Sequence, residues 1–244
     1  VPAARSGITT AEKVRDGIAS LAAYYDNMEG RTWRNLQDTT NQPIISDRGR
    51  QAWRSWQRSE DYYSEGQLIW FDADTLIREK SGGKKSLDDF ARVFFGVEDG
   101  RVEMLPYVFA DVVAALNAVI PHDWATFLRE RLDGKSPRAP LDGLARSGWK
   151  LVYTEKPSES GDRGGGSTDF SYSLGMSLGK DMKIGSVLWN GPAFKAGLAS
   201  SMTLVAVNGM AADADLLKDA VTEAKKSGAP IVLLVNNLDH IDTV

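Results

Sequence analysis

Two adjacent tyrosines, Tyr62 and Tyr63, lie near the start of the segment SEDYYSEGQLIWFDADTLIRE, which runs from residue 59 to residue 79. A tyrosine phenol has a pKa near 10, so at pH 7 it is a neutral hydrogen-bond donor. Such a donor can stabilise negative charge that develops only in a transition state. The same side chains could instead be aromatic residues that line a core, and the residues alone leave both interpretations open.

Residues that commonly bind zinc are scarce in this sequence. The chain has 244 residues, with no cysteine and two histidines, His122 and His240. Neither histidine belongs to an H-E-x-x-H motif, which would place two imidazoles on one face of a helix. We therefore expect no metal on this chain. The lack of cysteine also excludes disulfides and a cysteine nucleophile, and no serine lies in a nucleophile elbow.

Two aspartates, Asp72 and Asp74, are the remaining candidates for a hard-metal site. Two positions apart on a helix, their carboxylates face different sides. We expect them instead to pair with Arg78 or to cap neighbouring elements.

The composition is that of an ordinary globular protein, with 42% hydrophobic and 25% charged residues. The length suits one large or two ordinary domains. The net charge of -4 and the lack of a basic stripe argue against a nucleic-acid partner. No apolar run approaches the ~18 residues of a membrane span, so we expect a soluble protein, and the sequence does not choose between cytoplasm and periplasm. The start lacks Met and signal-peptide architecture, and we expect a chain cut from a longer one.

Helical periodicity dominates the first part of the chain. Apolar residues recur at helical spacing in the segment 9–30, where Thr9 and Glu12 have the spacing of a capping box. A long helix is expected from Asp61 to Lys80, ended by the glycines that follow. Further helices are expected at 86–96, 107–120, 123–134 and 140–148.

Residues 31–58 show no regular period and are rich in Trp and Arg. We expect Trp33, Trp53 and Trp56 to pack over neighbouring helices. The alternative, a stacking role in nucleic-acid binding, stays open at this point.

After about residue 140 the pattern changes from helical to β. We therefore predict two domains, a helical one over residues 1–140 and a β-rich one over residues 141–244. A helix is expected at 213–228. Short apolar runs predict strands at 149–155, 174–179, 183–189, 203–209 and 230–237.

Three segments of the second part resemble PDZ domains. YSLGMSL, residues 172–178, is similar to the carboxylate-binding loop of that family. NGPAFKAGL, residues 190–198, is similar to its G-P-A-x-x-A-G-L element, and LVAVNGM, residues 204–210, to its strand that ends in Asn-Gly. The resemblance implies a PDZ-like β-sandwich or barrel with two helices. ASSMT, residues 199–203, replaces the family's Gly-Asp turn, so we expect a distorted start of the strand that follows.

The PDZ resemblance implies a peptide-binding site at Leu174, Gly175, Met176 and Ser177. A glycine in this loop lets backbone N–H groups converge on a peptide carboxylate. The strand that follows is expected to present a free edge, to which a peptide adds as a further strand. The alternative is a PDZ fold that packs only against its own chain.

Three segments of the first part resemble the second half of the catalytic domain of glycyl-aminopeptidase-type zinc metallopeptidases. They are GRTWRNLQDTT (30–40), SWQRSEDYYSEGQLIWFDADTLIRE (55–79) and SGGKKSLDDFARVFFG (81–96), and they occur in the family's order. The resemblance implies an all-helical subdomain of a gluzincin-type, thermolysin-like catalytic domain. That family carries a PDZ domain directly after the catalytic domain, which agrees with the order in this chain.

In such aminopeptidases the tyrosine of a Y-x-x-G pattern donates a hydrogen bond to the tetrahedral oxyanion, and Tyr63-Ser64-Glu65-Gly66 fits that pattern. The resemblance therefore implies that Tyr63 is catalytic, whereas Tyr62 would point about 100° away on a helix. The zinc helix and general base of the family would lie before Val1. The implied partner of Tyr63 is thus a missing N-terminal catalytic half.

The main interpretation is the C-terminal part of a zinc-dependent aminopeptidase that releases Gly or Ala from peptides. Zinc is expected in the complete enzyme and not on this chain, which alone is expected to be inactive. The rival is a non-catalytic, PDZ-containing adaptor that binds peptides or peptide C-termini. An upstream H-E-x-x-H in the native protein would favour the enzyme, and a native start near Val1 would favour the adaptor.

Overall fold

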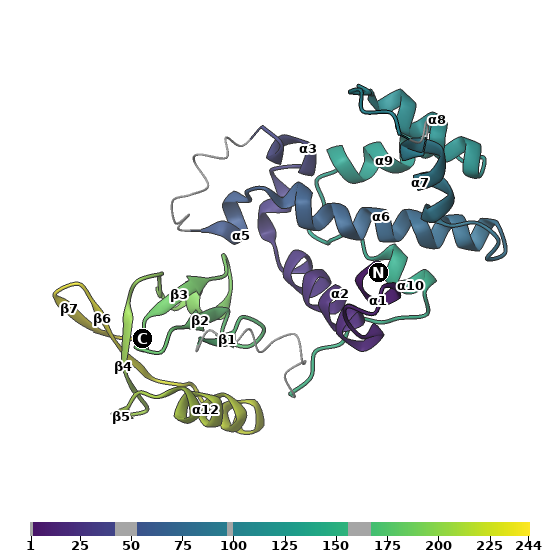
Figure 1. Cartoon of the computed structure of the whole chain (residues 1–244). Coiled ribbons are helices and arrows are strands. Elements are labelled where there is room, and N and C mark those ends of the chain that lie inside the picture. The colour runs from purple at the N-terminus through teal and green to yellow at the C-terminus, as the bar shows by residue number, and fades with distance from the viewer. Residues whose placement is uncertain (1, 42–52, 97–99, 156–166) are drawn as a thin grey trace. The chain divides into compact units, whose positions relative to one another are not determined.

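A computed structural model of the chain describes residues 2–41, 53–96, 100–155 and 167–244 (Figure 1). The chain divides into two compact units, which are described separately. Unit 1 comprises residues 1–26, 31–46 and 59–152. Unit 2 comprises residues 27–30, 47–58 and 153–244.

The predicted division into domains 1–140 and 141–244 stays a prediction. The boundaries of the two compact units differ from it in two places. Helix α10 (Asp142–Arg146) belongs to unit 1, because it packs closely on the long helix α6 (Asp61–Lys80). A Cβ on Gly143 would lie 2.8 Å from the Cα of Asp72. In addition, two short segments from the first part of the chain belong to unit 2.

The long helices of unit 1 lie where the apolar periodicity predicts them. Helix α2 ends at Asp26, earlier than expected, and a 3-10 turn spans Glu29–Thr32. None of the helices in the described part of the chain is long and apolar enough to cross a membrane. Besides α6 and α10, the helices of unit 1 are α1 (Pro2–Arg5), α2 (Ala11–Asp26), α3 (Leu36–Thr39), α7 (Leu87–Phe95), α8 (Phe109–Val119) and α9 (Trp124–Asp133).

Helix α7 begins at a capping box formed by Ser86 and Asp89. The Ser86 hydroxyl accepts a hydrogen bond from the backbone N–H of Asp88 at 3.2 Å, and Asp89 accepts one from the N–H of Ser86 at 2.9 Å. This capping box satisfies two amides that the first turn of a helix leaves without partners. Asp74, from α6, also accepts a hydrogen bond from the N–H of Leu87 at 2.8 Å. The end of one helix therefore fixes the start of the next.

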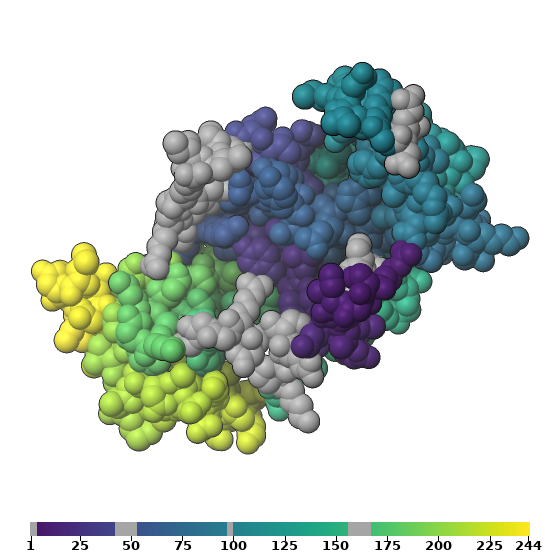
Figure 2. Space-filling view, viewed as in Figure 1, coloured from purple at the N-terminus to yellow at the C-terminus, as the bar shows by residue number. Residues whose placement is uncertain are grey.

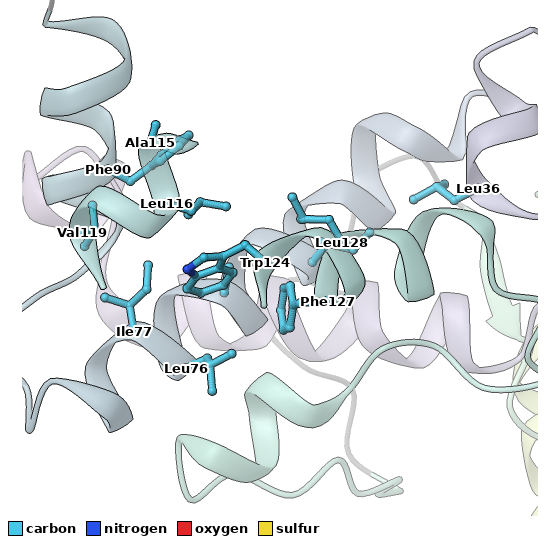
Figure 3. Close-up of a cluster of buried hydrophobic side chains, with 12 residues drawn as sticks. Leu36, Leu76, Ile77, Phe90, Ala115, Leu116, Val119, Trp124, Phe127 and Leu128 are labelled. Carbon is cyan, nitrogen blue, oxygen red and sulfur yellow. The ribbon is translucent and has the colours of Figure 1, made fainter. Parts of the chain in front are cut away.

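A single apolar cluster holds α6, α7, α8 and α9 together (Figure 3). Trp124 lies at its centre, fully buried, with Leu116, Ile77 and Phe127 around it. The Trp124 indole N–H donates to the Ile120 carbonyl at 2.9 Å, so the buried ring leaves no polar atom without a partner. The cluster comprises Leu36, Ile69, Ala73, Leu76, Ile77, Phe90, Ala115, Leu116, Val119, Trp124, Phe127 and Leu128.

Asp72 and Asp74 face different environments, as their spacing predicts. Asp74 pairs with Arg78 at 2.8 Å on the surface of α6. Asp72 is fully buried and contacts two guanidinium groups, those of Arg131 at 2.6 Å and of Arg146. Burial raises the pKa of Asp72, and the two arginines oppose that rise. The carboxylate therefore connects α6 to α9 and α10.

We predict that Asp72→Ala destabilises the chain by about 3–5 kcal/mol, because it removes the buried anion that two largely buried guanidinium groups share and leaves them only longer ion pairs, with Asp142 at 3.4 Å and Glu79 at 3.5 Å. Arg78→Ala is the matched control, since it breaks an exposed pair on the same helix and should change stability by about 0.2–1 kcal/mol. Urea unfolding of both variants measures the difference. Equal losses for the two variants would contradict the role of Asp72.

Unit 2 contains two antiparallel sheets, with strand orders β1-β2-β3 and β5-β4-β6-β7. In Figure 2 the turn between β6 and β7, in yellow, projects from the remainder of this unit. The strands are β1 (Thr168–Phe170), β2 (Met176–Leu178), β3 (Ile184–Val187), β4 (Thr203–Val207), β5 (Met210–Ala211), β6 (Leu233–Asn237) and β7 (His240–Thr243). The helices are α5 (Arg54–Gln57), α11 (Pro192–Lys195) and α12 (Ala214–Ser227).

The predicted strand at 149–155 is wrong. The backbone N–H of Trp149 bonds to the Leu144 carbonyl at 2.9 Å, at the end of α10, and the Trp149 ring stacks on Phe71. Residues 149–152 therefore continue the packing of unit 1, residues 153–155 belong to unit 2, and the segment has no strand pairing. In the turn before β4, Ser201 has a φ of 79°, in the left-handed region, and β4 pairs with β6 from its first residue, Thr203.

Trp53 and Trp56 pack in unit 2, beside helix α11. Trp56 stacks on Trp189 with ring centroids 5.0 Å apart, and Trp53 meets Trp189 and Phe194 edge-on. The Ser55 hydroxyl accepts a hydrogen bond from the N–H of Trp189 at 2.9 Å. An early segment thereby completes the aromatic packing around α11.

The close approach of Gly30 to the Trp56 segment gives a test of this packing. A Cβ at Gly30 would lie 2.7 Å from Cγ of Arg58 and closer still to the Trp56 carbonyl oxygen. Gly30→Ala should therefore destabilise unit 2 by about 1–3 kcal/mol through overpacking. Gly17→Ala, on the exposed face of α2 with nothing within 4 Å, should stabilise by about 0.5–1 kcal/mol. A thermal melt in which both variants behave alike would contradict the packing.

Candidate functional site

The first turn of α6 places the two tyrosines in different environments. Tyr63 is 65% exposed, whereas Tyr62 is partly buried against the apolar cluster of unit 1. Their ring centroids lie 4.5 Å apart with tilted planes. Tyr62 thus serves as an apolar support, while the side chain of Tyr63 is accessible to an incoming group.

Beside Tyr63 the helix surface is open. A Cβ built on Gly66 would meet nothing within 4 Å. Gly66 and Trp70 follow Tyr63 at intervals of three and seven residues, so they share its face of α6. Trp70 is itself 37% exposed and packs against Phe90. This face of α6 therefore presents the Tyr63 phenol, the open space over Gly66 and the Trp70 indole.

Buried polar contacts hold this turn from the inner side. Glu65, fully buried, forms an ion pair with Arg31, whose Nε also donates to the Arg138 carbonyl at 3.1 Å. The buried hydroxyl of Tyr25 is hydrogen-bonded to Ser64, and its pKa is raised by burial and by the negative charge of Asp61. The turn that carries Tyr63 is thus anchored by the residues immediately around it.

Sequence reasoning missed Arg31 and Tyr25 as supports of the site. Glu65 was noted for its place in the Y-x-x-G pattern, but its partner lies in a different part of the chain. A buried pair between distant segments leaves no periodic signal, so only the structure reveals it.

The described residues contain no group of three or more His, Cys, Asp or Glu side chains that could hold a metal ion. His122 is half-buried and meets Trp124 edge-on at 5.1 Å, and its pKa is lowered by burial and by the charge of Lys80. His240 is exposed in β7, beside Asp239. The described residues therefore do not fit a zinc site.

The predicted peptide-binding residues lie at the junction of a loop and a strand in unit 2. Leu174 and Gly175 end the loop after β1, and Met176 and Ser177 begin β2. The free edge that we expected beside β2 is absent, because β2 lies between β1 and β3. The binding role of these four residues stays a prediction.

Gly175 is required by the backbone of unit 2 itself. Its φ is 77°, in the region that favours glycine, and a Cβ would lie 3.3 Å from the Cα of Gly191 and 3.3 Å from Cδ of Pro192. A substitution here would strain the loop whether or not a ligand binds. Gly175 variants therefore cannot by themselves test peptide capture.

Comparison with known proteins relates the first part of the chain to a peptidase family. Residues 1–69 match the family model of M61 glycyl aminopeptidase, a range that includes the Tyr63 turn. The crystal structure of an aminopeptidase N family protein from Idiomarina loihiensis is similar over 99% of this chain, with a TM-score of 0.54 and 18% identity. This chain covers 41% of that one. A search of curated proteins found no match.

These comparisons support a peptidase relationship at the level of the family for the matched residues, and the structural likeness shows the fold. The role of Tyr63 in catalysis stays a prediction.

The metal content of the chain is directly testable. Because the described residues offer no zinc-binding group, we expect chain 1–244 to retain well under one zinc per molecule after dialysis. Elemental analysis gives the ratio, with an established zinc enzyme dialysed alongside as the control. Stoichiometric zinc together with hydrolysis of Gly- or Ala-amides would contradict the expectation.

Proposed function

We propose that the chain is the C-terminal part of a zinc-dependent aminopeptidase that releases small N-terminal residues, such as Gly or Ala, from peptides. The observation that carries this proposal is the match of residues 1–69 to the M61 glycyl aminopeptidase family. The exposure of Tyr63 within that range supports it, because a catalytic donor must reach a substrate.

In this proposal the Tyr63 phenol donates a hydrogen bond to the peptide carbonyl oxygen as that oxygen gains negative charge. A donor fixed before the reaction stabilises such charge without reorganisation. The buried pair of Arg31 and Glu65 and the Tyr25–Ser64 contact supply that fixation at the inner side of the turn. The gap over Gly66 leaves room for the substrate backbone beside the phenol.

Zinc, its ligands and the general base belong, in this proposal, to an N-terminal catalytic half outside residues 1–244. The described residues do not fit a zinc site. What this chain contributes to the reaction is the phenol and its support.

Unit 2 is proposed to be a PDZ-like domain that binds peptides or peptide C-termini. The combination of two small sheets with the helices α11 and α12 supports this proposal. Gly175, which has a positive φ directly before β2, supports it as well. The partners of the complete protein are then peptides, at both the catalytic and the PDZ-like site.

Paired tyrosine variants of the complete native protein test the catalytic role. Tyr63→Phe removes the hydrogen bond but keeps the ring, so kcat for Gly- and Ala-amide substrates should fall roughly 10²- to 10³-fold. KM should change little, because the bond forms mainly in the transition state. Tyr62→Phe is the matched control and should be milder, since Tyr62 packs on the core.

Equal activity of the two variants, or a larger loss for Tyr62→Phe, would contradict the assignment of Tyr63. A native protein that hydrolyses no such amide, with or without added zinc, would contradict the aminopeptidase itself and leave an adaptor as the explanation.

A further inference from the structure

We propose that unit 2 contains a peptide-strand site that the chain fills with its own residues Thr168–Phe170, so that an external peptide binds only when β1 leaves. The proposal deepens the peptide-binding part of the proposed function and rests on it. It identifies the occupant of the site in this structure and the class of peptide that would replace it.

The pairing of the strands places β1 in the position of an added peptide. Strand β1 runs antiparallel to β2, with Thr168 opposite Leu178 and Phe170 opposite Met176. The other edge of β2 pairs with β3. Since a strand has two edges and both edges of β2 are taken, a peptide could pair with β2 at this position only in place of β1.

The end of β1 meets the loop in the way a peptide terminus would. The carbonyl oxygen of Phe170 accepts hydrogen bonds from the N–H groups of Ser173, Leu174 and Gly175, at 3.1, 3.0 and 2.9 Å. Converging backbone N–H groups form a binding site for anions. Here the neutral carbonyl occupies the site that the sequence predicts for a carboxylate.

The loop is held in this shape by bonds to a second segment. The Leu174 carbonyl accepts the N–H of Ala193 at 2.8 Å, and the Gly175 carbonyl accepts the N–H of Leu188 at 2.7 Å. Gly175 also packs against Gly191. The carbonyl groups of the loop are thereby engaged elsewhere, and its N–H groups are fixed toward Phe170.

The side chains of β1 define which peptides could compete. Phe170 is buried in the same apolar cluster as Met176 and Leu217, the latter from α12. Asp169 is exposed, and Thr168 is half-buried. A competing peptide should therefore end in a large apolar residue with a free carboxylate, and its penultimate residue should matter little.

The tether between β1 and β2 gives the internal strand a large advantage. A short connection, here residues 171–175, corresponds to an effective concentration on the order of millimolar. The apparent affinity of an external peptide falls in proportion to the fraction of open sites. With an intrinsic dissociation constant of about 1–10 μM for β1 itself, an external peptide would bind the intact chain about 10²- to 10³-fold more weakly than the open site.

The test uses the full chain and a dye-labelled peptide that ends in -Thr-Asp-Phe with a free carboxylate. Phe170→Ala removes the side chain that anchors β1, so fluorescence polarisation should show at least tenfold tighter binding than wild type. Val235→Ala is the matched control, because it also removes buried apolar atoms of unit 2 but leaves β1 paired. It should bind like wild type. An amidated peptide should bind the Phe170 variant more weakly than the free acid.

A second variant keeps the test valid if Phe170→Ala fails to fold. Thr168→Gly with Asp169→Gly weakens the strand without touching the core, and it removes the Asp169 bond to the N–H of Ser171 at 2.8 Å. It should raise affinity severalfold. Hydrogen exchange of the wild type provides a readout without peptide, and the Leu174 and Gly175 amides should be protected.

Each outcome decides between the two proposals. Equal affinity of wild type and both β1 variants overturns the internal occupant and leaves peptide binding intact. Folded variants that bind no peptide at all overturn the peptide site, and with it the peptide-binding role of unit 2. Rapid exchange of the Leu174 and Gly175 amides in wild type overturns the internal occupant whatever the peptide data show.

Discussion

Two carboxylates on one face of α6, those of Glu65 and Asp72, are fully buried. Each of them needs a cationic side chain as its partner. A buried charge without a partner is strongly unfavourable, and removing one member of such a pair typically costs about 3–5 kcal/mol. Arg31 reaches Glu65, and Arg131 and Arg146 reach Asp72. These cations come from three different segments of unit 1. The need to pair two charges therefore fixes the position of α6 among its neighbours.

The same constraint separates the roles of the two tyrosines. Glu65 faces inward, so Tyr63, two residues earlier on the helix, faces outward to solvent. Tyr62 lies between these directions and packs on the core. A rotation of α6 that buried Tyr63 would take Glu65 away from Arg31. The exposure of the candidate catalytic phenol is thus coupled to a buried ion pair.

Local signals in the sequence predicted the helices well. Ser86 and Asp89 sit at capping positions, and the glycines after Lys80 end α6, because both effects depend on neighbouring residues only. Long-range contacts left no such signal. The predicted strand at 149–155 failed because the ring of Trp149 found a partner in Phe71, which its own segment does not indicate. The Trp53 and Trp56 contacts with Trp189 were missed for the same reason.

The loop before β2 shows how a chain can satisfy its own converging N–H groups. Its converging N–H groups are strong donors, and a folded chain rarely leaves such groups unpaired. A peptide carboxylate satisfies them, but so does the Phe170 carbonyl in the same chain. The two acceptors differ in charge, and hydrogen bonds to an ionised group are about twice as strong as neutral ones. A peptide carboxylate would form stronger hydrogen bonds with these N–H groups, whereas the Phe170 carbonyl is kept close to them by its tether. In our proposal, the balance of these two effects determines whether β1 or an external peptide occupies the site.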